Sequence, residues 1–317
     1  MSKGQKNTIV WIVVALILVC SGVVLFFATR TSQENLTIDR TDGPLFSAPM
    51  QKNPAFIEIS PGVKFKFDTG SDLSTLTPEL LARLDSLGYN VRRSLYPVIG
   101  RDGVGQTHFY SERYTVDLPF YSWQCTADSL GQYHYSMLDE QPNVFRGVDF
   151  VVADNGVPTL GIDFIEKFKV EYICREGMLS LYTSTPEGYE VCEKIKVSHS
   201  PSHWIKLGHR YSMEITVNRT PSLFFIDTGV RRAFVKMPMA DLPSDSNGFL
   251  SDTVSSYLGQ YDCQIDTTAW LQIGNREGRH EVYYFNNLEE AHSFNPLNVF
   301  FIDVVIDFPG RQLLFRR

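Results

Sequence analysis

The tripeptide Asp-Thr-Gly occurs twice, at residues 68–70 and 227–229, and each copy follows a short apolar run. Hydrolysis of a peptide bond needs a base that activates water and an acid that protonates the carbonyl oxygen or the leaving amine. Two carboxylates about 3 Å apart cannot both ionise at neutral pH, so they share a proton and divide these roles. The repeated motif therefore makes Asp68 and Asp227 candidates for an acid–base pair that titrates as one unit.

The sequence around the two motifs also repeats, which places the two aspartates at equivalent points of two similar halves. A hairpin is predicted before each motif, because apolar and alternating residues flank the turn residues 60–62 and 218–221. After the first motif, Thr77-Pro78 predicts the start of a helix, and Met237-Pro238 lies at almost the same distance from the second motif. The predicted hairpin strands are 56–59, 63–67, 213–217 and 223–226.

A glycine follows each motif at the same distance, and the first of the two lies in a glycine-rich segment. Gly100 lies 32 residues beyond Asp68, and Gly259 lies 32 residues beyond Asp227. We interpret the first segment as a hairpin tip that closes over an extended substrate and excludes water, hereafter the flap. An ordinary surface hairpin is the alternative. The predicted flap residues are Gly100, Arg101, Asp102, Gly103, Val104 and Gly105.

Two stretches of the first half carry a family resemblance. They are Phe67-Asp68-Thr69-Gly70-Ser71 and Thr159-Leu160-Gly161-Ile162-Asp163-Phe164. With the second Asp-Thr-Gly, the chain resembles a two-lobed aspartic protease of the pepsin and retropepsin superfamily over roughly residues 50–317. The resemblance implies a mostly β fold, in which two pseudo-symmetric retropepsin-like lobes enclose an interlobe cleft. The second half departs from the pattern, because no glycine follows the apolar residue at Leu297-Asn298.

The residues that follow each aspartate are expected to support the pair. Gly70 and Gly229 let the backbone pass close to the carboxylates and offer N–H donors to them. The resemblance implies that Thr69 and Thr228 exchange hydrogen bonds across the lobe interface. Ser71 is placed to bond the outer oxygen of Asp68, whereas Val230 follows the second motif and has no hydroxyl group. We therefore predict that the two carboxylates are unequal and that Asp227 carries the proton.

Residues 8–28 form one apolar stretch without a charge, long enough to cross a bilayer as a helix. We predict an uncleaved anchor with residues 1–7 in the cytoplasm, and a cleaved signal peptide is the alternative. Either places the rest of the chain outside the cytoplasm, in a periplasmic, extracellular or lumenal space. The polar residues 29–49 are predicted to be a stalk.

The remaining chain is divided into an N-terminal lobe at 50–185, a connection at 186–203 and a C-terminal lobe at 204–317. The connection is placed there because Pro, Gly and Ser gather in it. Four cysteines lie outside the apolar stretch, and their pairing stays open. Cys174 and Cys192 are the nearest to each other in sequence.

Several functional classes find no support. The net charge is −7 and no basic cluster is interleaved with aromatics, which argues against nucleic-acid binding. No cofactor or metal motif is present; His199 and His203 flank Pro201, which prevents a helical metal-binding spacing. The sequence predicts a membrane-anchored aspartic endopeptidase that acts on peptides or unfolded proteins as a monomer. The alternatives are a catalytically silent receptor or scaffold with the same cleft, and an enzyme whose lobes pair between chains.

Overall fold

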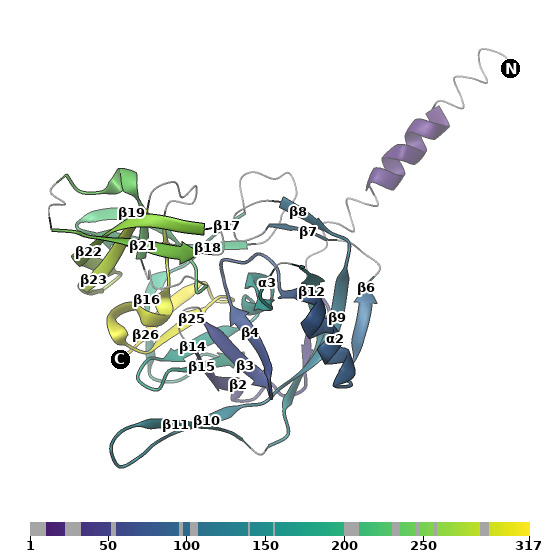
Figure 1. Ribbon diagram of the computed structural model, residues 1–317, viewed down its shortest axis with the longest axis horizontal. Helices are drawn as coiled ribbons and strands as arrows, with labels where there is room; N and C mark the ends of the chain where they lie inside the picture. Colours follow the sequence, from purple (N-terminus) through teal and green to yellow (C-terminus); the bar gives the residue numbers. More distant parts are fainter. Residues whose placement is uncertain are drawn as a thin grey trace.

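The computed structural model describes residues 11–22, 33–51, 55–94, 98–101, 107–138, 140–154, 156–199, 209–229, 235–244, 248–256, 259–285 and 292–317. Strands dominate it, as predicted. Figure 1 shows strands of the C-terminal half at upper left and strands of the N-terminal half at right, with the sheet that contains strands of both halves below the first group. The predicted mostly β class is confirmed.

The N-terminal lobe is built on an eight-stranded sheet in the order β3-β4-β13-β5-β12-β9-β6, with β1 paired to β12. On β4, Val63, Phe65 and Phe67 are fully buried while Lys64 and Lys66 lie on the opposite face. The strands are β1 (Thr37–Ile38), β3 (Phe56–Ser60), β4 (Val63–Phe67), β5 (Thr75–Leu76), β6 (Val91–Ser94), β9 (Arg113–Phe120), β12 (Asn143–Val152) and β13 (Thr159–Leu160).

The C-terminal lobe repeats this strand order as β18-β19-β24-β20-β23-β22-β21, with β17 added beside β18. The pairing directions also repeat: β4–β13 and β19–β24 are parallel, as are β5–β12 and β20–β23. The predicted internal repeat is therefore a repeat of topology. The strands are β17 (Lys196–His199), β18 (His209–Val217), β19 (Thr220–Ile226), β20 (Val235–Pro238), β21 (Leu250–Ser256), β22 (Gly259–Ile273), β23 (Arg276–Phe285) and β24 (Ser293–Phe294).

A six-stranded sheet in the order β16-β26-β25-β14-β15-β2 joins the two halves, because its strands come from both. Its seam is the antiparallel pair β14–β25. One hydrophobic core cluster runs through this sheet and both lobes. The strands are β2 (Pro44–Pro49), β14 (Lys169–Ile173), β15 (Met178–Tyr182), β16 (Tyr189–Lys194), β25 (Val304–Asp307) and β26 (Gln312–Arg316).

Among the described residues, two further hairpins and four short helices complete the lobes. Thr77 caps α2 as predicted, since its hydroxyl oxygen accepts a hydrogen bond from the Leu80 amide and Pro78 opens the helix. The hairpins are β7 (Val98–Arg101) with β8 (Thr107–Tyr110), and β10 (Trp123–Ala127) with β11 (Tyr133–Met137). The helices are α2 (Pro78–Ser86), α3 (Ile162–Ile165), η1 (Met239–Asp241) and η2 (Pro296–Phe301).

The predicted stalk differs from the structure. Residues 33–49 pack against the N-terminal lobe and the central sheet instead of extending away from them. Leu45, Phe46 and Ala48 on β2 are buried, and β2 pairs with β15. Gln33 is buried as well and donates a hydrogen bond to the carboxylate of Asp163 at 3.2 Å. Burial of these apolar side chains away from water stabilises the folded state. The folded domain therefore begins before residue 50.

The predicted connection at 186–203 contains two strands in its described part. β16 pairs with β26 in the central sheet, and β17 pairs with β18 in the C-terminal lobe. The chain thus crosses between the lobes as paired backbone up to His199, and residues 200–203 lie outside the described residues. All five cysteines are free thiols in the structure.

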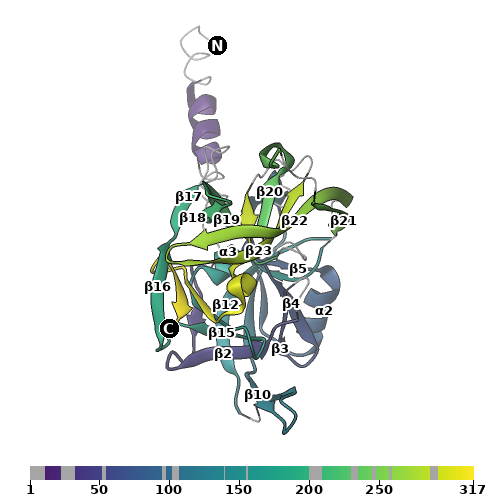
Figure 2. The ribbon, with the colours of Figure 1, turned by 90° about the vertical axis from the view of Figure 1, so that its left-hand side faces the viewer.

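Residues 11–22 form an exposed helix that projects away from the lobes (Figures 1 and 2). Among the described residues, no helix is both long and apolar enough to cross a membrane. Residues 8–10 and 23–28 of the predicted anchor, and the predicted tail at 1–7, lie outside the described residues.

Candidate active site

The two Asp-Thr-Gly motifs lie at equivalent strand ends. β4 delivers Asp68 and β19 delivers Asp227, after the buried residues Phe67 and Ile226. The neighbouring parallel strands hold both turns: the Asp68 amide donates to the Leu160 carbonyl at 3.1 Å, and the Asp227 amide donates to the Phe294 carbonyl at 2.9 Å. The backbone at Asp68 is therefore held in the same way as the backbone at Asp227.

Thr69 and Thr228 lock the two motifs together across the lobes. The Thr69 amide donates to Thr228 Oγ1 at 3.0 Å, and the Thr228 amide donates to Thr69 Oγ1 at 3.0 Å. Each hydroxyl group then donates to a carbonyl of the other lobe, Thr69 to Ile226 at 2.9 Å and Thr228 to Phe67 at 3.0 Å. Both threonines are buried. This is the exchange that the family resemblance implied.

The two carboxylates meet above the motif glycines. The Gly70 amide donates to Asp68 Oδ1 at 2.9 Å, and the Gly229 amide donates to Asp227 Oδ1 at 3.0 Å. A Cβ atom placed on Gly70 would lie 2.8 Å from Asp227 Oδ1 and 3.0 Å from Asp68 Oδ1. A Cβ atom on Gly229 would overlap the carboxylate of Asp68. Only glycine leaves room for this approach, so each glycine faces the carboxylate of the opposite lobe.

The electrostatics of the pair are unequal. Burial, and after it the negative charge of Asp68, raise the pKa of Asp227 to about 6, although Lys236, Lys66 and the Gly229 amide act in the opposite direction. This shift favours Asp227 as the carrier of the proton that the pair shares. This agrees with the proton carrier predicted from the sequence.

The predicted reason for that inequality is not the one in the structure. The hydroxyl group of Ser71 donates to the Leu73 carbonyl at 2.9 Å and not to Asp68. The outer oxygen of Asp68, Oδ2, instead binds the ammonium group of Lys66 at 2.6 Å. Val230 lies outside the described residues. Sequence reasoning missed Lys66 as a partner of Asp68, because a lysine on an alternating strand is typical of a solvated face. Lys66 lies two residues before Asp68 and therefore on the same face of the strand, and this spacing could have indicated the contact.

The raised pKa of Asp227 predicts a pH limit for any chemistry that uses its proton. As the pH rises through about 6, Asp227 of the free protein loses the proton that it must donate, so kcat/KM should fall about tenfold for each further pH unit. A pH–rate profile between pH 4 and 8 with one peptide substrate measures this. A profile that stays flat from pH 5 to 8 would contradict the assignment of the proton to Asp227.

Asn295 occupies the place in the C-terminal lobe that Gly161 occupies in the N-terminal lobe. The register of β13 with β4 matches that of β24 with β19, so Leu160 corresponds to Phe294. A Cβ atom on Gly161 would overlap the backbone of Leu73, at 2.5 Å. Asn295 is buried in the matching place; its amide group donates to the Thr228 carbonyl at 3.3 Å, and its oxygen accepts from the Leu297 amide at 3.0 Å. The departure that the sequence placed at Leu297-Asn298 therefore falls at Asn295, where a side-chain amide braces the motif.

The predicted flap is described only in part. β7 and β8 form a hairpin in which Gly100 pairs with His108 and Arg101 pairs with Thr107. At its base, Val98 packs with Leu73 and Val151 beside the first motif. Asp102, Gly103, Val104 and Gly105 lie outside the described residues, so their closing role stays a prediction. In the C-terminal lobe, Gly259 begins β22 and pairs with Ser256 at the end of β21, which is also a hairpin tip.

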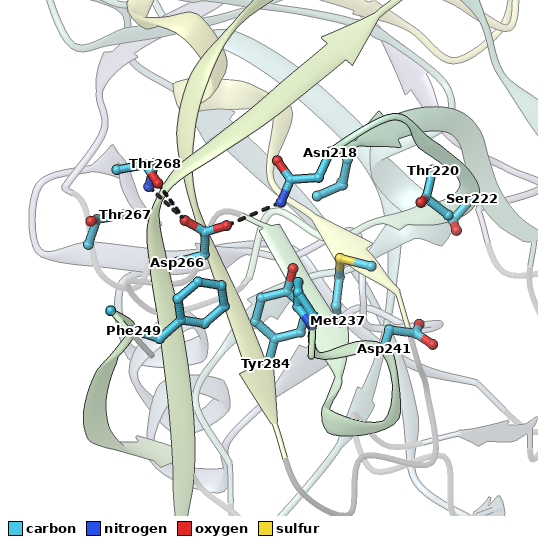
Figure 3. Close-up of a pocket in the computed structure, with 13 residues that line it drawn as sticks. Asn218, Thr220, Ser222, Met237, Asp241, Phe249, Asp266, Thr267, Thr268 and Tyr284 are labelled. Atoms are coloured by element: carbon cyan, nitrogen blue, oxygen red, sulfur yellow. Dashed lines mark hydrogen bonds between the residues drawn. The ribbon is translucent and has the colours of Figure 1, made fainter. Parts of the chain in front are cut away.

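A cavity of about 780 Å³ lies in the C-terminal lobe (Figure 3). Neither Asp68 nor Asp227 lines it. It lies between the turn that joins β18 to β19 and the short helix η1. In the N-terminal lobe the corresponding segment after β5 is the longer helix α2, which buries Leu80 and Leu84. Asp266 in the cavity wall accepts hydrogen bonds from Asn218 and from the Thr268 amide. Among the described residues, no group of His, Cys, Asp and Glu is arranged to hold a metal ion.

Comparison with known proteins gives structural likeness alone. No family model matches the chain, and no curated protein matches it. The solved structure of EDGP is similar at a TM-score of 0.49 and 9% identity, over 87% of this chain and 96% of that one. Conglutin gamma, a basic 7S globulin from lupine seeds, is similar at 0.43 and 8% identity, over 89% and 94%. Basic 7S globulin from soybean is similar at 0.42 and 8% identity, over 86% and 96%.

Proposed function

We propose that the protein is an aspartic endopeptidase of the two-lobed pepsin and retropepsin type, which hydrolyses peptide bonds with water activated between Asp68 and Asp227. The observation that supports this most is the reciprocal bonding of Thr69 and Thr228, which fixes both carboxylates relative to each other. A turn that only capped a strand would need no such cross-lobe exchange. The raised pKa of Asp227 adds a proton donor opposite a carboxylate that is paired with a lysine.

The proposed steps follow from these protonation states. Asp68 takes a proton from water while the water oxygen bonds to the peptide carbonyl carbon, and Asp227 gives its proton to the carbonyl oxygen. A neutral tetrahedral diol results. Asp68 then delivers its proton to the amide nitrogen as the C–N bond breaks, and one hydroxyl group of the diol returns a proton to Asp227. The pair ends with one proton on Asp227, as it began, and no metal or organic cofactor takes part.

The proposed substrate is a peptide or an unfolded segment, bound extended between the lobes. Extended peptides bind through backbone hydrogen bonds to exposed strand edges, with side chains alternating between pockets. The β7–β8 hairpin beside the first motif offers one such edge. Incubation of the full-length protein with a denatured protein, followed by mass spectrometry of the products, tests the proposal. Fragments absent from an Asp68→Asn control are the expected result.

A catalytically silent peptide receptor is the second candidate, and one observation favours it. The ion pair of Lys66 with Asp68 places a positive charge on the carboxylate that must act as the base. If folded protein binds extended peptides without cleaving any of them between pH 3 and 8, the receptor is correct. Cleavage that depends on both aspartates supports the enzyme.

We also propose that residues 8–28 anchor the chain with the lobes outside the cytoplasm, and that one chain acts alone because it supplies both aspartates. In intact cells, a membrane-impermeant protease should digest the lobes, and alkaline carbonate should leave the protein with the membranes. Release by carbonate would contradict the anchor. Activity per molecule should stay constant on dilution, whereas lobes that pair between chains would lose activity.

A further inference from the structure

Lysines from both lobes lie beside the aspartate pair. Lys66 binds Asp68 Oδ2 at 2.6 Å, and its side chain is only 20% exposed. Lys236 on β20 makes no ion pair with any residue that the structure describes, and its Nζ lies 5.8 Å from the centre of the Phe285 ring. Both ammonium groups act on the carboxylate of Asp227, Lys236 more strongly than Lys66. One cation from each lobe therefore acts on the aspartate pair.

The strand register shows that Lys66 belongs to the face over which the β7–β8 hairpin lies. Lys66 is paired with Thr159, Thr159 with Thr75, and Thr75 with Val151, so these four side chains share one face of the sheet. Val151 packs against Val98 of β7. The core residues of β4 point to the opposite face. Lys66 is therefore directed toward the space between the sheet and the hairpin.

The C-terminal lobe carries the matching row. Phe225 is paired with Ser293, Ser293 with Lys236, and Lys236 with Tyr283. The guanidinium group of Arg210 lies 5.4 Å from the centre of the Phe225 ring, which adds a third cation to this face. Glu281, two residues before Tyr283 on β23, adds an acidic group beside the row and accepts a hydrogen bond from the Tyr283 hydroxyl at 3.1 Å.

The charge around the pair is positive although the chain as a whole is negative. With one proton, Asp68 and Asp227 together carry one negative charge and Glu281 adds a second, against the three positive charges of Lys66, Lys236 and Arg210. The whole chain carries a net charge of −7, which would repel acidic peptides elsewhere on its surface. An ammonium group has three N–H donors, and a partly buried one binds carboxylates more strongly than a solvated one.

We propose that Lys66 and Lys236 make the cleft selective for peptides that carry a carboxylate side chain, Asp or Glu, next to the scissile bond. The inference rests on the proposed endopeptidase function and names its substrate class. Lys66 is a specificity residue that is held in place by Asp68, so it meets the substrate without first being ordered. A neutral side chain in the same place would gain no attraction from the two ammonium charges.

A peptide library with one varied position on each side of the cleaved bond tests this with the full-length protein. We expect kcat/KM for Asp- and Glu-containing peptides to exceed that for their Asn and Gln counterparts by tenfold to a hundredfold, on the order of one charged hydrogen bond. The Lys66→Met and Lys236→Met variants should each lower this acid-to-amide ratio at least about fivefold. The ratio is used because Lys66→Met also changes the surroundings of Asp68.

Lys64→Met is the matched control. Lys64 lies on the same strand and face as Lys66, is 44% exposed and pairs with Glu58 at 3.4 Å, so its loss should leave the ratio unchanged. Lys66→Arg should retain the ratio, and Lys236→Met covers the case in which Lys66→Met does not fold. Cleavage without acid preference would overturn the inference while leaving the endopeptidase intact. No cleavage of any peptide by folded protein would instead overturn the proposed function, and this inference with it.

Discussion

Replacement of Asp227 by asparagine is expected to reduce kcat/KM for peptide cleavage by about a thousandfold or more, because the variant can neither donate nor take back the shared proton. The geometry should survive, since asparagine has the same shape and the Gly229 amide keeps a carbonyl-type acceptor at Oδ1. Asp68→Asn should cost as much, because it removes the base, and the double variant should be little worse than either single one, as groups that act as a unit are not additive.

The same Asp227→Asn variant is expected to be more stable than the parent at neutral pH. In the folded protein the pKa of Asp227 lies near 6, above its ordinary value of 3.8, so folding favours the protonated form. The stability that this proton contributes is complete below about pH 4 and is lost as the pH rises through 6. Asparagine cannot ionise, so the variant should gain roughly 3 kcal/mol over the parent above pH 7 and less than about 1 kcal/mol at pH 4.

Urea unfolding at pH 4 and pH 7.5 measures this difference. Asp85→Asn, a change at an exposed residue of α2, is the control and should shift neither value. Equal effects of Asp227→Asn at both pH values would mean that Asp227 is not protonated through burial and proximity to Asp68. A loss of activity together with a gain of stability in Asp227→Asn would show that Asp227 destabilises the fold but is required for catalysis.

Thr228→Val is expected to lower the free energy of unfolding by about 3 kcal/mol. Valine has the shape of threonine but leaves the Phe67 carbonyl and the Thr69 amide, both in the buried interface, without their partner. Each buried unpaired group costs about 1–3 kcal/mol. Thr69→Val should cost a similar amount through Ile226 and the Thr228 amide. Cleavage should fall in both variants because the two carboxylates lose their relative placement.

Denaturant unfolding of the two single variants and the double variant checks the exchange. The double variant should lose less than the sum of the single ones, because the four bonds form one network. Thr228→Ser retains the hydroxyl group and should stay within about 1 kcal/mol of the parent. A loss below 0.5 kcal/mol in Thr228→Val would contradict the bonding described between the lobes.

Local patterns predicted the parts of the fold that short-range physics determines. The hairpins before each Asp-Thr-Gly, the start of α2 at Thr77-Pro78 and the repeat of the two halves all follow from alternation, capping and turn residues. β2 was missed because the short apolar segment Pro44–Pro49 begins and ends with proline and closes a polar stretch. Its pairing with β15 depends on residues more than 100 positions away, and Phe46 packs against the distant Phe120, neither of which a local pattern records.

The candidate site was predictable in its centre and less so around it. The aspartates, threonines and glycines are one repeated motif, so sequence located all of them. The partner of the outer oxygen of Asp68 was assigned to Ser71 by its proximity in the chain, whereas the long side chain of Lys66 reaches that oxygen from the same strand face. Asn295 was missed because the sequence search looked for a second glycine. Its equivalence to Gly161 follows only from the strand register.

The most direct test of the account is digestion of a denatured protein by the full-length chain in detergent, from pH 3 to 8, beside Asp68→Asn and Asp227→Asn. We expect the parent to generate new peptide termini, with a rate that declines above about pH 6, and each variant to generate none above background. Circular dichroism and a cooperative unfolding transition establish that all three are folded. Folded parent protein that yields no new termini at any pH, or termini that persist in both variants, would contradict a hydrolytic pair at Asp68 and Asp227.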